Sequence, residues 1–381
     1  MHIDLSSEQE MLRESAARFL RDRYHFSERT RIIASAEGYD KSKWREFGEM
    51  GWLGLPFPEE YGGTGGTMFD VMLLMKAFGR SLVVEPFMPS VVLGGLTILG
   101  AGSHERKKEF LPQIASGHLQ IAFGFAEPKA GYDAHDISTR AQSHGNGFRL
   151  DGRKAVVLGA PSADYIIVSA RTGGAQCDAQ GISLFIFKTS TPGVTLRSYQ
   201  TIDGRRAAEI MMDDVRLGHD QLLGEAGSAA PIIDEVLMAG RVAVLGEAVG
   251  SLYGAVDQTV EYLNVREQFG KKLSTYQGLR HRVADMYILA READALAGIA
   301  ARAFIHKQGA ARFSAISGAK AYVGEEGRWV AENAVQLHGA IAITDEYIVG
   351  HYLKRIIAID RMFGDVEHNL DAFMKGVSAL N

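Results

Sequence analysis

Residues 262–277 read YLNVREQFGKKLSTYQ and lie between two long stretches of helical periodicity. The first helical pattern contains Arg241, and the second runs from about residue 279 to about residue 307. Gly270 fits the end of the first helix, where a glycine can turn left-handed without a Cβ clash. Ser274 fits the N-cap of the second helix. The segment therefore predicts a corner between two helices.

The side chains of this corner have the chemistry of a nucleotide diphosphate site. Arg266 offers a planar fork of donors that suits a phosphate, and Gln268 offers an amide donor and acceptor. Phe269 adds a flat apolar face. A simpler interpretation, a solvated charge beside a packed phenylalanine, fits the same residues. Their chemistry alone leaves both interpretations open.

The composition indicates a globular protein with a large core. The chain has 381 residues, 46% hydrophobic and 23% charged, which is typical of two or three domains. The formal net charge of -5 gives no sign of a nucleic-acid surface. The single cysteine, Cys177, excludes an internal disulfide and argues against a metal site built from cysteine thiolates, and we expect no metal. Without a signal-peptide pattern or a membrane-spanning apolar run, we expect a cytoplasmic protein with no membrane insertion.

The periodicity of the sequence changes twice. Residues 1–118 and 229–381 show helical patterns, whereas residues 119–228 contain six runs rich in β-forming residues. No long helix separates these runs, so we expect an antiparallel sheet, closed as a barrel or packed as a sandwich. The predicted domains are therefore a helical N-terminal domain, a central antiparallel β-barrel domain and a C-terminal helical bundle. The six runs are 119–127, 147–158, 165–170, 182–188, 194–199 and 208–217.

Two local signals mark the N-terminal part of the chain. Ser7 is followed three residues later by Glu10, the pattern of a capping box at a helix start. Residues 62–66 read GGTGG, and their spacing fits neither a Walker loop nor a dinucleotide fingerprint. This Gly-rich stretch is interpreted as a connector between helices.

Three segments together resemble the acyl-CoA dehydrogenase family. The corner matches the family's Arg-x-Gln-Phe-Gly pattern, followed by a glutamine at position 277. Residues 56–66, PFPEEYGGTGG, resemble a segment at the same place in the family, and residues 336–344, QLHGAIAIT, resemble its Gln-x-His-Gly-Gly-x-Gly. The predicted order of helices, β-domain and helical bundle is also that of the family, so the resemblance covers the whole chain.

The resemblance implies FAD as the cofactor, shared between neighbouring subunits. Phe125 and Ala126 would line the flavin. Gln336 and Gly339 would approach the adenosine diphosphate part of FAD bound by a neighbouring subunit, and Arg266 would reach its diphosphate. Gln268, Phe269 and Gln277 complete the flavin-binding corner that the resemblance implies.

Several positions depart from the family pattern. Ala126 stands where the family carries a threonine whose hydroxyl bonds the flavin, and Val156 and Leu158 replace an aromatic wall and a second hydroxyl. Ala340 and Ala342 replace two glycines. We expect their added methyl groups to crowd a close approach of backbone and phosphate.

The catalytic base is the sharpest departure. The family removes the proton next to a thioester carbonyl with a glutamate, which occupies one of two known positions. Here these positions carry Phe363 and Gly240, and neither residue accepts a proton. The nearby acids are Asp365, Glu367 and Glu247, and the first is ranked highest because only a local shift separates it from the base position. Each also fits an exposed or ion-paired carboxylate.

The sequences at residues 350–355, GHYLKR, and 363–368, FGDVEH, narrow the resemblance. They are similar to the small subunits of two-component acyl-CoA dehydrogenases, such as the pimeloyl-CoA dehydrogenase small subunit, and to subunits in bacterial steroid degradation. The resemblance implies a homotetramer, or a heterotetramer with a second acyl-CoA dehydrogenase-like subunit, in fatty acid or steroid degradation. Electron-transfer flavoprotein is the implied electron acceptor.

Three functions follow from these features. The first is an FAD-dependent acyl-CoA dehydrogenase subunit that desaturates an acyl-CoA thioester between Cα and Cβ. The second is a non-catalytic subunit that completes and stabilises the flavin site of a heteromeric enzyme, which the missing base favours. The third is another flavin enzyme, such as an oxidase that uses Asp365.

Overall fold

The computed structural model describes residues 5–379, and the chain divides into two compact units. The helical unit consists of the residues up to 31, residues 68–83 and the residues from 241 onward. The sheet unit consists of residues 32–67 and 84–240. Each unit joins segments that are distant in sequence, which periodicity along the chain does not reveal. The division into three domains stays a prediction.

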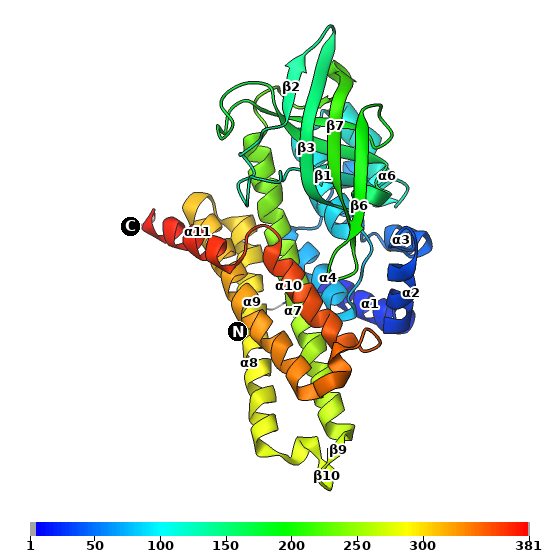
Figure 1. Ribbon diagram of the computed structural model, residues 1–381, viewed down its shortest axis with the longest axis vertical. Helices are drawn as coiled ribbons and strands as arrows, with labels where there is room; N and C mark the ends of the chain where they lie inside the picture. Colours follow the sequence, from blue (N-terminus) through cyan, green and yellow to red (C-terminus); the bar gives the residue numbers. More distant parts are fainter. Residues whose placement is uncertain (1–4, 380–381) are drawn as a thin grey trace. The chain divides into compact units, whose positions relative to one another are not determined.

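Helix α9 lies at the centre of the helical unit and packs against α8, α10 and α11, while α4 packs against α1 and α8 (Figure 1). The helical patterns predicted for residues 1–118 and 229–381 are confirmed for the helices of this unit. None of the described helices is long and apolar enough to cross a membrane. The helices are α1 (Ser7–Arg23), α2 (Phe26–Ala34), α4 (Met68–Ser81), α7 (Ala230–Val265), α8 (Gln277–His306), α9 (Gly309–His338), α10 (Ile348–Arg361) and α11 (Val366–Ser378), with parts of α2 and α7 in the sheet unit.

Glycines let α4 and α7 touch along their backbones. A Cβ on Gly250 would lie 1.9 Å from the carbonyl oxygen of Lys76, and one on Gly246 would lie 2.3 Å from another carbonyl oxygen of α4. On α4, a Cβ on Gly79 would lie 1.9 Å from the carbonyl oxygen of Glu247. Because Gly246 and Gly250 are about one helical turn apart, both fall on the same face of α7.

The capping box of the first helix lies one residue before the predicted position. Ser6 is the N-cap of α1, and its side chain accepts a hydrogen bond from the amide of Gln9. The Gln9 side chain in turn accepts one from the amide of Ser6. Both Ser6–Gln9 and Ser7–Glu10 have the capping-box spacing, and the prediction chose the second.

The sheet unit is organised around one sheet in the order β6-β7-β3-β2-β4-β5-β8, with β1 beside β4. The pairs are antiparallel except β1 with β4 and β2 with β4, which are parallel. Parallel pairing of β1 and β4 is possible because about forty residues separate them. The order ends at β6 and β8, so the described strands form an open sheet and not the closed barrel that was expected. The strands are β1 (Ile121–Gly124), β2 (Arg140–Ser143), β3 (Gly147–Leu158), β4 (Tyr165–Arg171), β5 (Ile182–Lys188), β6 (Val194–Gln200), β7 (Arg206–Gly218) and β8 (Leu222–Leu223).

All six predicted β-runs contain a strand, whereas β2 and β8 were not predicted. Strand β2 has a single buried residue, Ala141, and β8 is two residues long. Neither has the alternation or apolar content that identifies a strand in sequence. Both are stabilised by pairing with strands that are themselves well marked.

Short helices accompany the sheet. The π-helix η2 packs against β1 and α6, and α6 also packs against α5. Helix α6 lies within residues 1–118, for which a helical pattern was predicted. The helical elements before the sheet are α3 (Lys41–Glu49), η1 (Glu59–Tyr61), η2 (Met88–Gly95), α5 (Leu96–Ala101) and α6 (His104–Ala115).

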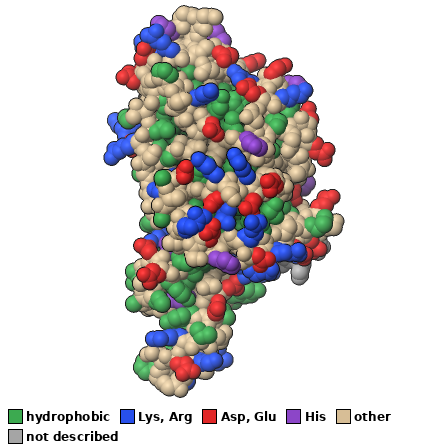
Figure 2. Space-filling view, turned by 90° about the vertical axis from the view of Figure 1, so that its right-hand side faces the viewer, with side chains coloured by type: hydrophobic (Ala, Val, Ile, Leu, Met, Phe, Trp, Pro, Cys, Tyr) green, Lys and Arg blue, Asp and Glu red, His purple; other side chains and the backbone are tan. Residues whose placement is uncertain are grey.

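The face of the molecule shown in Figure 2 mixes charges of both signs. Lysine and arginine side chains lie interspersed with aspartate and glutamate side chains, and hydrophobic side chains lie between them. This distribution accords with a formal net charge of -5. This face has no broad basic patch of the kind that binds a polyanion.

Candidate functional site

The predicted corner after α7 contains a small β-hairpin. Helix α7 ends at Val265, and strands β9 (Glu267–Gln268) and β10 (Lys271–Lys272) pair in antiparallel fashion. Phe269 and Gly270 form the two-residue loop with φ angles of 54° and 80°, as a type I′ turn requires at both positions. Gly270 therefore does turn left-handed, but in a hairpin and not at the end of a helix.

Phe269 is strained and almost fully exposed. A left-handed phenylalanine is a conformational outlier, and this side chain is 90% exposed. The packed phenylalanine of the simpler interpretation is therefore wrong for this chain. A strained backbone that presents a bare aromatic ring is typical of a binding surface.

The start of α8 differs from the prediction. Ser274 lies in the 3-10 helix η5 (Leu273–Thr275), and the N-cap of α8 is Tyr276, whose side chain makes no capping hydrogen bond. Instead, the Tyr276 hydroxyl donates to the carbonyl oxygen of Gln268 at 3.2 Å. The hairpin is thereby tied to the helix start. Without a side-chain cap, amide groups of the first turn of α8 are left for solvent or a ligand.

Five arginine and lysine side chains surround the hairpin and the start of α8. Within residues 266–282 only Glu267 opposes them, and all five are exposed. Cations are unfavourable near a helix N-terminus, so this arrangement is typical of a site for a bound anion. The sequence prediction named only Arg266, although the other cations of the segment carry the same signal. The five are Arg266, Lys271, Lys272, Arg280 and Arg282.

The segment around Gln336 lies at the C-terminal end of α9, beside the end of α7. The ring of His338 stacks on Tyr262 with centroids 4.4 Å apart, and its Nδ1–H donates to the Ala334 carbonyl oxygen at 2.8 Å. Burial lowers the pKa of His338, which keeps the ring neutral at pH 7. Because Tyr262 precedes Arg266 by about one turn of helix, the fold brings Gln336 and the hairpin to the same end of the helical unit.

The two alanines that replace family glycines lie in different environments. They belong to the 3-10 helix η6 (Gly339–Ile343), where Gly339 has φ 69° and open space at its Cβ position. Ala340 is exposed, whereas Ala342 is buried, and a Cβ on Gly350 would lie 2.4 Å from the carbonyl oxygen of Ala342. The expectation that its methyl group crowds a phosphate is therefore wrong for Ala342. For the exposed Ala340 it stays a prediction.

In the sheet unit, Phe125 and Ala126 follow β1 and are half-buried. The Ala126 carbonyl oxygen accepts a 2.9 Å hydrogen bond from the amide of Ala155, which ties this segment to β3. The register of β3 shifts here, and Val156 in this bulge has φ 50° and is 57% exposed. A β-branched residue rarely takes this conformation. The bulge thus presents an apolar side chain to solvent at the predicted flavin wall.

A buried ion pair fixes this part of the sheet unit. The Nζ of Lys154 donates to Oε1 of Glu127 at 2.8 Å, and the amide of Thr139 donates to the same oxygen at 3.0 Å. Burial alone would raise the pKa of Glu127, but Lys154 and the donors of Ser138 and Thr139 lower it to about 2. Burial lowers the pKa of Lys154 to about 8, although Glu127 opposes this shift. The pair holds the segment that carries Ala126.

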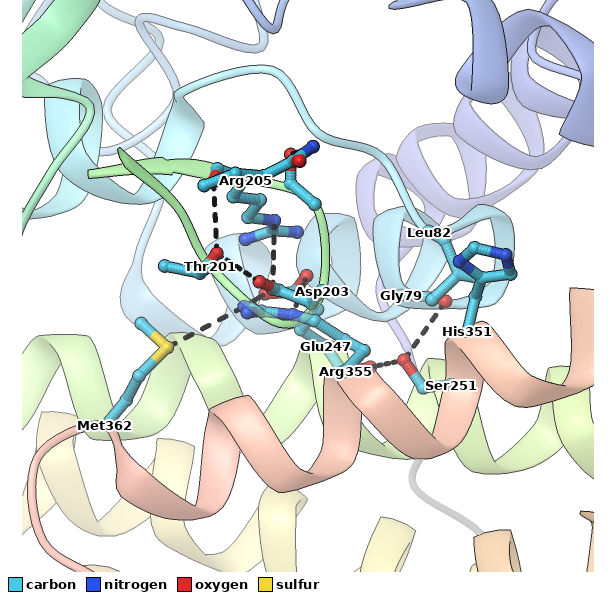
Figure 3. A network of polar contacts seen from close by, with 12 residues as sticks. Gly79, Leu82, Thr201, Asp203, Arg205, Glu247, Ser251, His351, Arg355 and Met362 are labelled. Carbon is cyan, nitrogen blue, oxygen red and sulfur yellow. Dashed lines mark hydrogen bonds and ion pairs between the residues drawn. The ribbon is translucent and has the colours of Figure 1, made fainter. Parts of the chain in front are cut away.

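Glu247, one of the predicted candidate bases, forms a buried ion pair with Arg355 (Figure 3). Its Oε1 accepts from Nε at 2.9 Å and its Oε2 from the second guanidinium nitrogen at 2.7 Å. The same nitrogen lies 3.8 Å from the sulfur of Met362, and the Ser251 hydroxyl donates to the Gly79 carbonyl oxygen at 3.2 Å. Both carboxylate oxygens of Glu247 are thus occupied by an arginine.

Asp365, the other candidate base, is the N-cap of α11. Its Oδ1 accepts from the amide of His368 at 3.0 Å, and its Oδ2 accepts from Arg361 at 2.9 Å. Phe363, two residues earlier, places an aromatic side chain at the expected base position. Both predicted carboxylates therefore have structural partners, and their assignment as bases stays a prediction.

Three sequence models that describe one family match this chain. The acyl-CoA dehydrogenase N-terminal domain matches residues 6–118, the middle domain residues 122–215 and the C-terminal domain residues 230–377.

Individual proteins are similar over most of their length. The probable acyl-CoA dehydrogenase YngJ of Bacillus subtilis is 30% identical, with 93% of each chain covered. The caffeyl-CoA reductase-Etf complex subunit CarC of Acetobacterium woodii is 30% identical over 79% of this chain and 80% of that protein. Among solved structures, the steroid ACAD variant Tcur3481-Tcur3483 superposes with a TM-score of 0.86, at 27% identity and with 98% of each chain covered.

Proposed function

The chain belongs to the acyl-CoA dehydrogenase family, and we propose that it serves as one subunit of a tetrameric enzyme that desaturates an acyl-CoA thioester between Cα and Cβ. The family consists of FAD-dependent oxidoreductases. The observation that carries the proposal is the exposed basic hairpin with the strained Phe269 at its tip. The positive charge and the exposed aromatic ring of this surface support binding of an anionic, partly flat ligand.

The residues at the hairpin fit the diphosphate part of FAD. Arg266 and Lys271 offer charge-assisted donors, the start of α8 offers free amide groups, and Gly339 leaves open space at the end of α9. Because these residues are exposed on this chain, we propose that they hold the cofactor of a neighbouring subunit.

The residues around Ala126 and Val156 fit the flavin ring only through main-chain and apolar contacts. Neither side chain has a hydroxyl group, and the Ala126 carbonyl oxygen is already bonded to the amide of Ala155. FAD, when bound, takes up the hydride that leaves Cβ of the acyl chain. The chain's own residues at this wall would orient the ring and exclude water.

Removal of the Cα proton needs a positioned carboxylate, since this proton is weakly acidic even beside a thioester. Phe363 cannot accept it, and the oxygens of Glu247 and Asp365 accept hydrogen bonds from arginines and an amide. These contacts support the second candidate function, a subunit that completes a flavin site while an unlike partner supplies the base. The similarity to a steroid ACAD whose name joins two designations, Tcur3481 and Tcur3483, agrees with such a partner.

Electron-transfer flavoprotein is the acceptor that we propose for the reduced cofactor. One relative of this chain, CarC, is named as a subunit of a complex with Etf.

The test is the FAD content of the assembled enzyme after Arg266→Ala. We expect less bound FAD per tetramer at limiting FAD, because a diphosphate loses one charge-assisted donor pair worth roughly 1.5–3 kcal/mol. Arg328→Ala, at an exposed arginine on α9 paired with Glu332, is the matched control and should retain FAD. Unchanged FAD content in Arg266→Ala at limiting FAD would contradict the proposed cofactor site.

A further inference from the structure

The turn between α10 and α11 has an unusual backbone at two successive residues. Phe363 has φ 59° and Gly364 has φ 102°. The left-handed conformation is costly for phenylalanine. A Cβ on Gly364 would lie 2.4 Å from the ring of His368, so glycine is required there. Contacts from outside the turn can offset the cost of this conformation.

Two cations from other helices supply that support. Lys320 of α9 donates through Nζ to the carbonyl oxygens of Asp360 at 3.1 Å and Gly364 at 3.0 Å. Arg241 of α7 donates through Nε to the carbonyl oxygen of Phe363 at 3.0 Å. Three carbonyl groups around one turn are therefore held from two helices at once.

The burial of Lys320 is costly unless its ammonium group finds hydrogen-bond acceptors such as these carbonyl oxygens. Lys320 is 1% exposed and Arg241 is 9% exposed, and within the described part of the chain Lys320 forms no ion pair at 4 Å or less. Burial lowers the pKa of Lys320 to about 8; Asp360 and Asp365 raise it, and Arg241 and Arg361 lower it further. If the side chain only filled space in the core, an apolar residue of similar length would avoid the cost of burying a charge.

On the basis of the function proposed above, we propose that Lys320 and Arg241 are positioning residues that fix the backbone at residue 363, the position of the catalytic base in related chains. The three hydrogen bonds from Lys320 and Arg241 to this turn are here called the clamp. All three are present in this protein although residue 363 is a phenylalanine. The chain therefore retains the support for a base and lacks only its carboxylate.

This assignment predicts a gain of function in Phe363→Glu. The introduced carboxylate would take the Cα proton as the Cβ hydride passes to FAD, so that the two electrons of the former Cβ–H bond reach the cofactor and a 2,3-enoyl thioester remains. Because Lys320 holds the carbonyl oxygen of Gly364, directly after residue 363, the gain should depend on that lysine.

The first experiment is hydrogen–deuterium exchange of the full chain, read on peptides covering residues 362–369. The amides of Met362, His368 and Asn369 are hydrogen-bonded in this turn and report on its order. In Lys320→Met we expect their exchange to be at least about tenfold faster, because two charge-assisted hydrogen bonds are lost. Lys320→Arg keeps the charge and should restore most of the protection.

Lys154→Met is the matched control, since it also removes a buried lysine but lies in the sheet unit. It should lower overall stability without a selective effect on residues 362–369. Equal exchange in Lys320→Met and the unmodified chain would overturn the clamp, as would equal acceleration in Lys154→Met. If Lys320→Met does not fold, Arg241→Gln, which removes the third contact, is measured in its place by the same criterion.

The second experiment measures turnover of an acyl-CoA by the FAD-loaded assembly whose other subunits carry no base. Phe363→Glu should raise kcat by about 10²-fold, and adding Lys320→Met should remove about tenfold of this gain while Lys320→Arg keeps it. A gain that does not depend on Lys320 contradicts the clamp. Absence of any gain, with the exchange result as expected, leaves the clamp in place and contradicts the proposed desaturation at this site.

Discussion

At the scale of single residues, backbone strain marks the places where this chain departs from simple packing. Five described residues other than glycine have positive φ, and three of them are Val156, Phe269 and Phe363. Each such conformation costs about 1–3 kcal/mol. These three fall at the predicted flavin wall, the hairpin tip and the base position. These three strained residues therefore lie at positions where the family resemblance implies contact with the cofactor or the substrate.

Phe269→Gly tests whether this strain serves binding. We expect the free energy of unfolding of the isolated chain to rise by up to about 1 kcal/mol, because glycine adopts a left-handed φ without cost. FAD retention by the assembled protein should fall, because the aromatic surface is lost. Denaturant unfolding and flavin absorbance measure the two effects. Asp214→Gly is the control, because it relieves a similar φ of 51° at a residue outside the proposed site, and it should leave FAD retention unchanged. If the Phe269→Gly chain were less stable than the unmodified chain, the left-handed backbone at residue 269 would not be a source of strain.

The Glu127–Lys154 pair makes a second prediction, which concerns acid. The pKa of Glu127 in the folded state is about 2, below its ordinary value of 4.5, so its contribution is fully present above pH 4.5. It is lost as the pH falls from about 4.5 to about 2, by up to about 3 kcal/mol. Lys154 is protonated in both states below about pH 7 and adds no slope there.

Urea unfolding between pH 2 and pH 7 checks this dependence. In Glu127→Gln we expect lower stability at pH 7, by about 3–5 kcal/mol because Lys154 is left buried without its carboxylate. The same variant should show a flatter decline in acid. An equally steep acid decline in Glu127→Gln would show that other groups cause it.

At the scale of elements, the contact between α4 and α7 depends on the absence of side chains. Gly246 and Gly250 on α7 and Gly79 on α4 bring the two backbones together. Glu247, which lies between these two glycines on α7, forms an ion pair with Arg355 on α10. Close approach of two helices and a buried ion pair thus fix the orientation of α7.

Gly250→Ala tests this contact. A Cβ there would meet the Lys76 carbonyl oxygen at 1.9 Å, so the helices must separate, and we expect a loss of roughly 1–3 kcal/mol or more. Gly278→Ala is the control, because that glycine is also helical but has open space around its Cβ position. It should be neutral or stabilising by about 0.5–1 kcal/mol. Thermal unfolding of both variants gives the comparison, and equal stability would mean that the helices relax freely.

At the scale of the whole molecule, the groups proposed to bind the diphosphate part of FAD are exposed on the chain. The hairpin, the start of α8 and Gly339 are exposed, whereas the acids nearest to the base position have partners within the helical unit. Such a distribution favours an assembly in which unlike chains complete one another's sites.

Mixing of subunits tests this arrangement. We expect the pure chain to be slow or inactive as an acyl-CoA dehydrogenase, because a missing general base costs roughly 10²–10⁴-fold in rate. Activity should appear when the co-purifying partner is added, and replacing the partner's glutamate should abolish it. Asp365→Asn and Glu247→Gln in this chain should change the rate of the mixture only mildly. Robust turnover by the pure chain, lost in Asp365→Asn, would identify Asp365 as the base instead.

The sequence by itself determined the fold class, the family and most elements of this protein. Helical and β-type periodicity follow from local geometry, so runs such as 147–158 and 182–188 could be identified residue by residue. The positive φ of Gly270 was likewise a local property. Short elements without a pattern of their own, such as β2, were beyond this reasoning because pairing with neighbours stabilises them.

Only the tertiary structure decided which side chains meet. The pairing of Glu247 with Arg355 joins residues more than a hundred positions apart, and no local signal links them. The same holds for Lys320 and the turn at Gly364, which come from different helices. Packing also decided that Phe269 is exposed and that Ala342 is buried. Contacts between distant segments depend on how whole elements fit together, and that information is not contained in any one stretch of the chain.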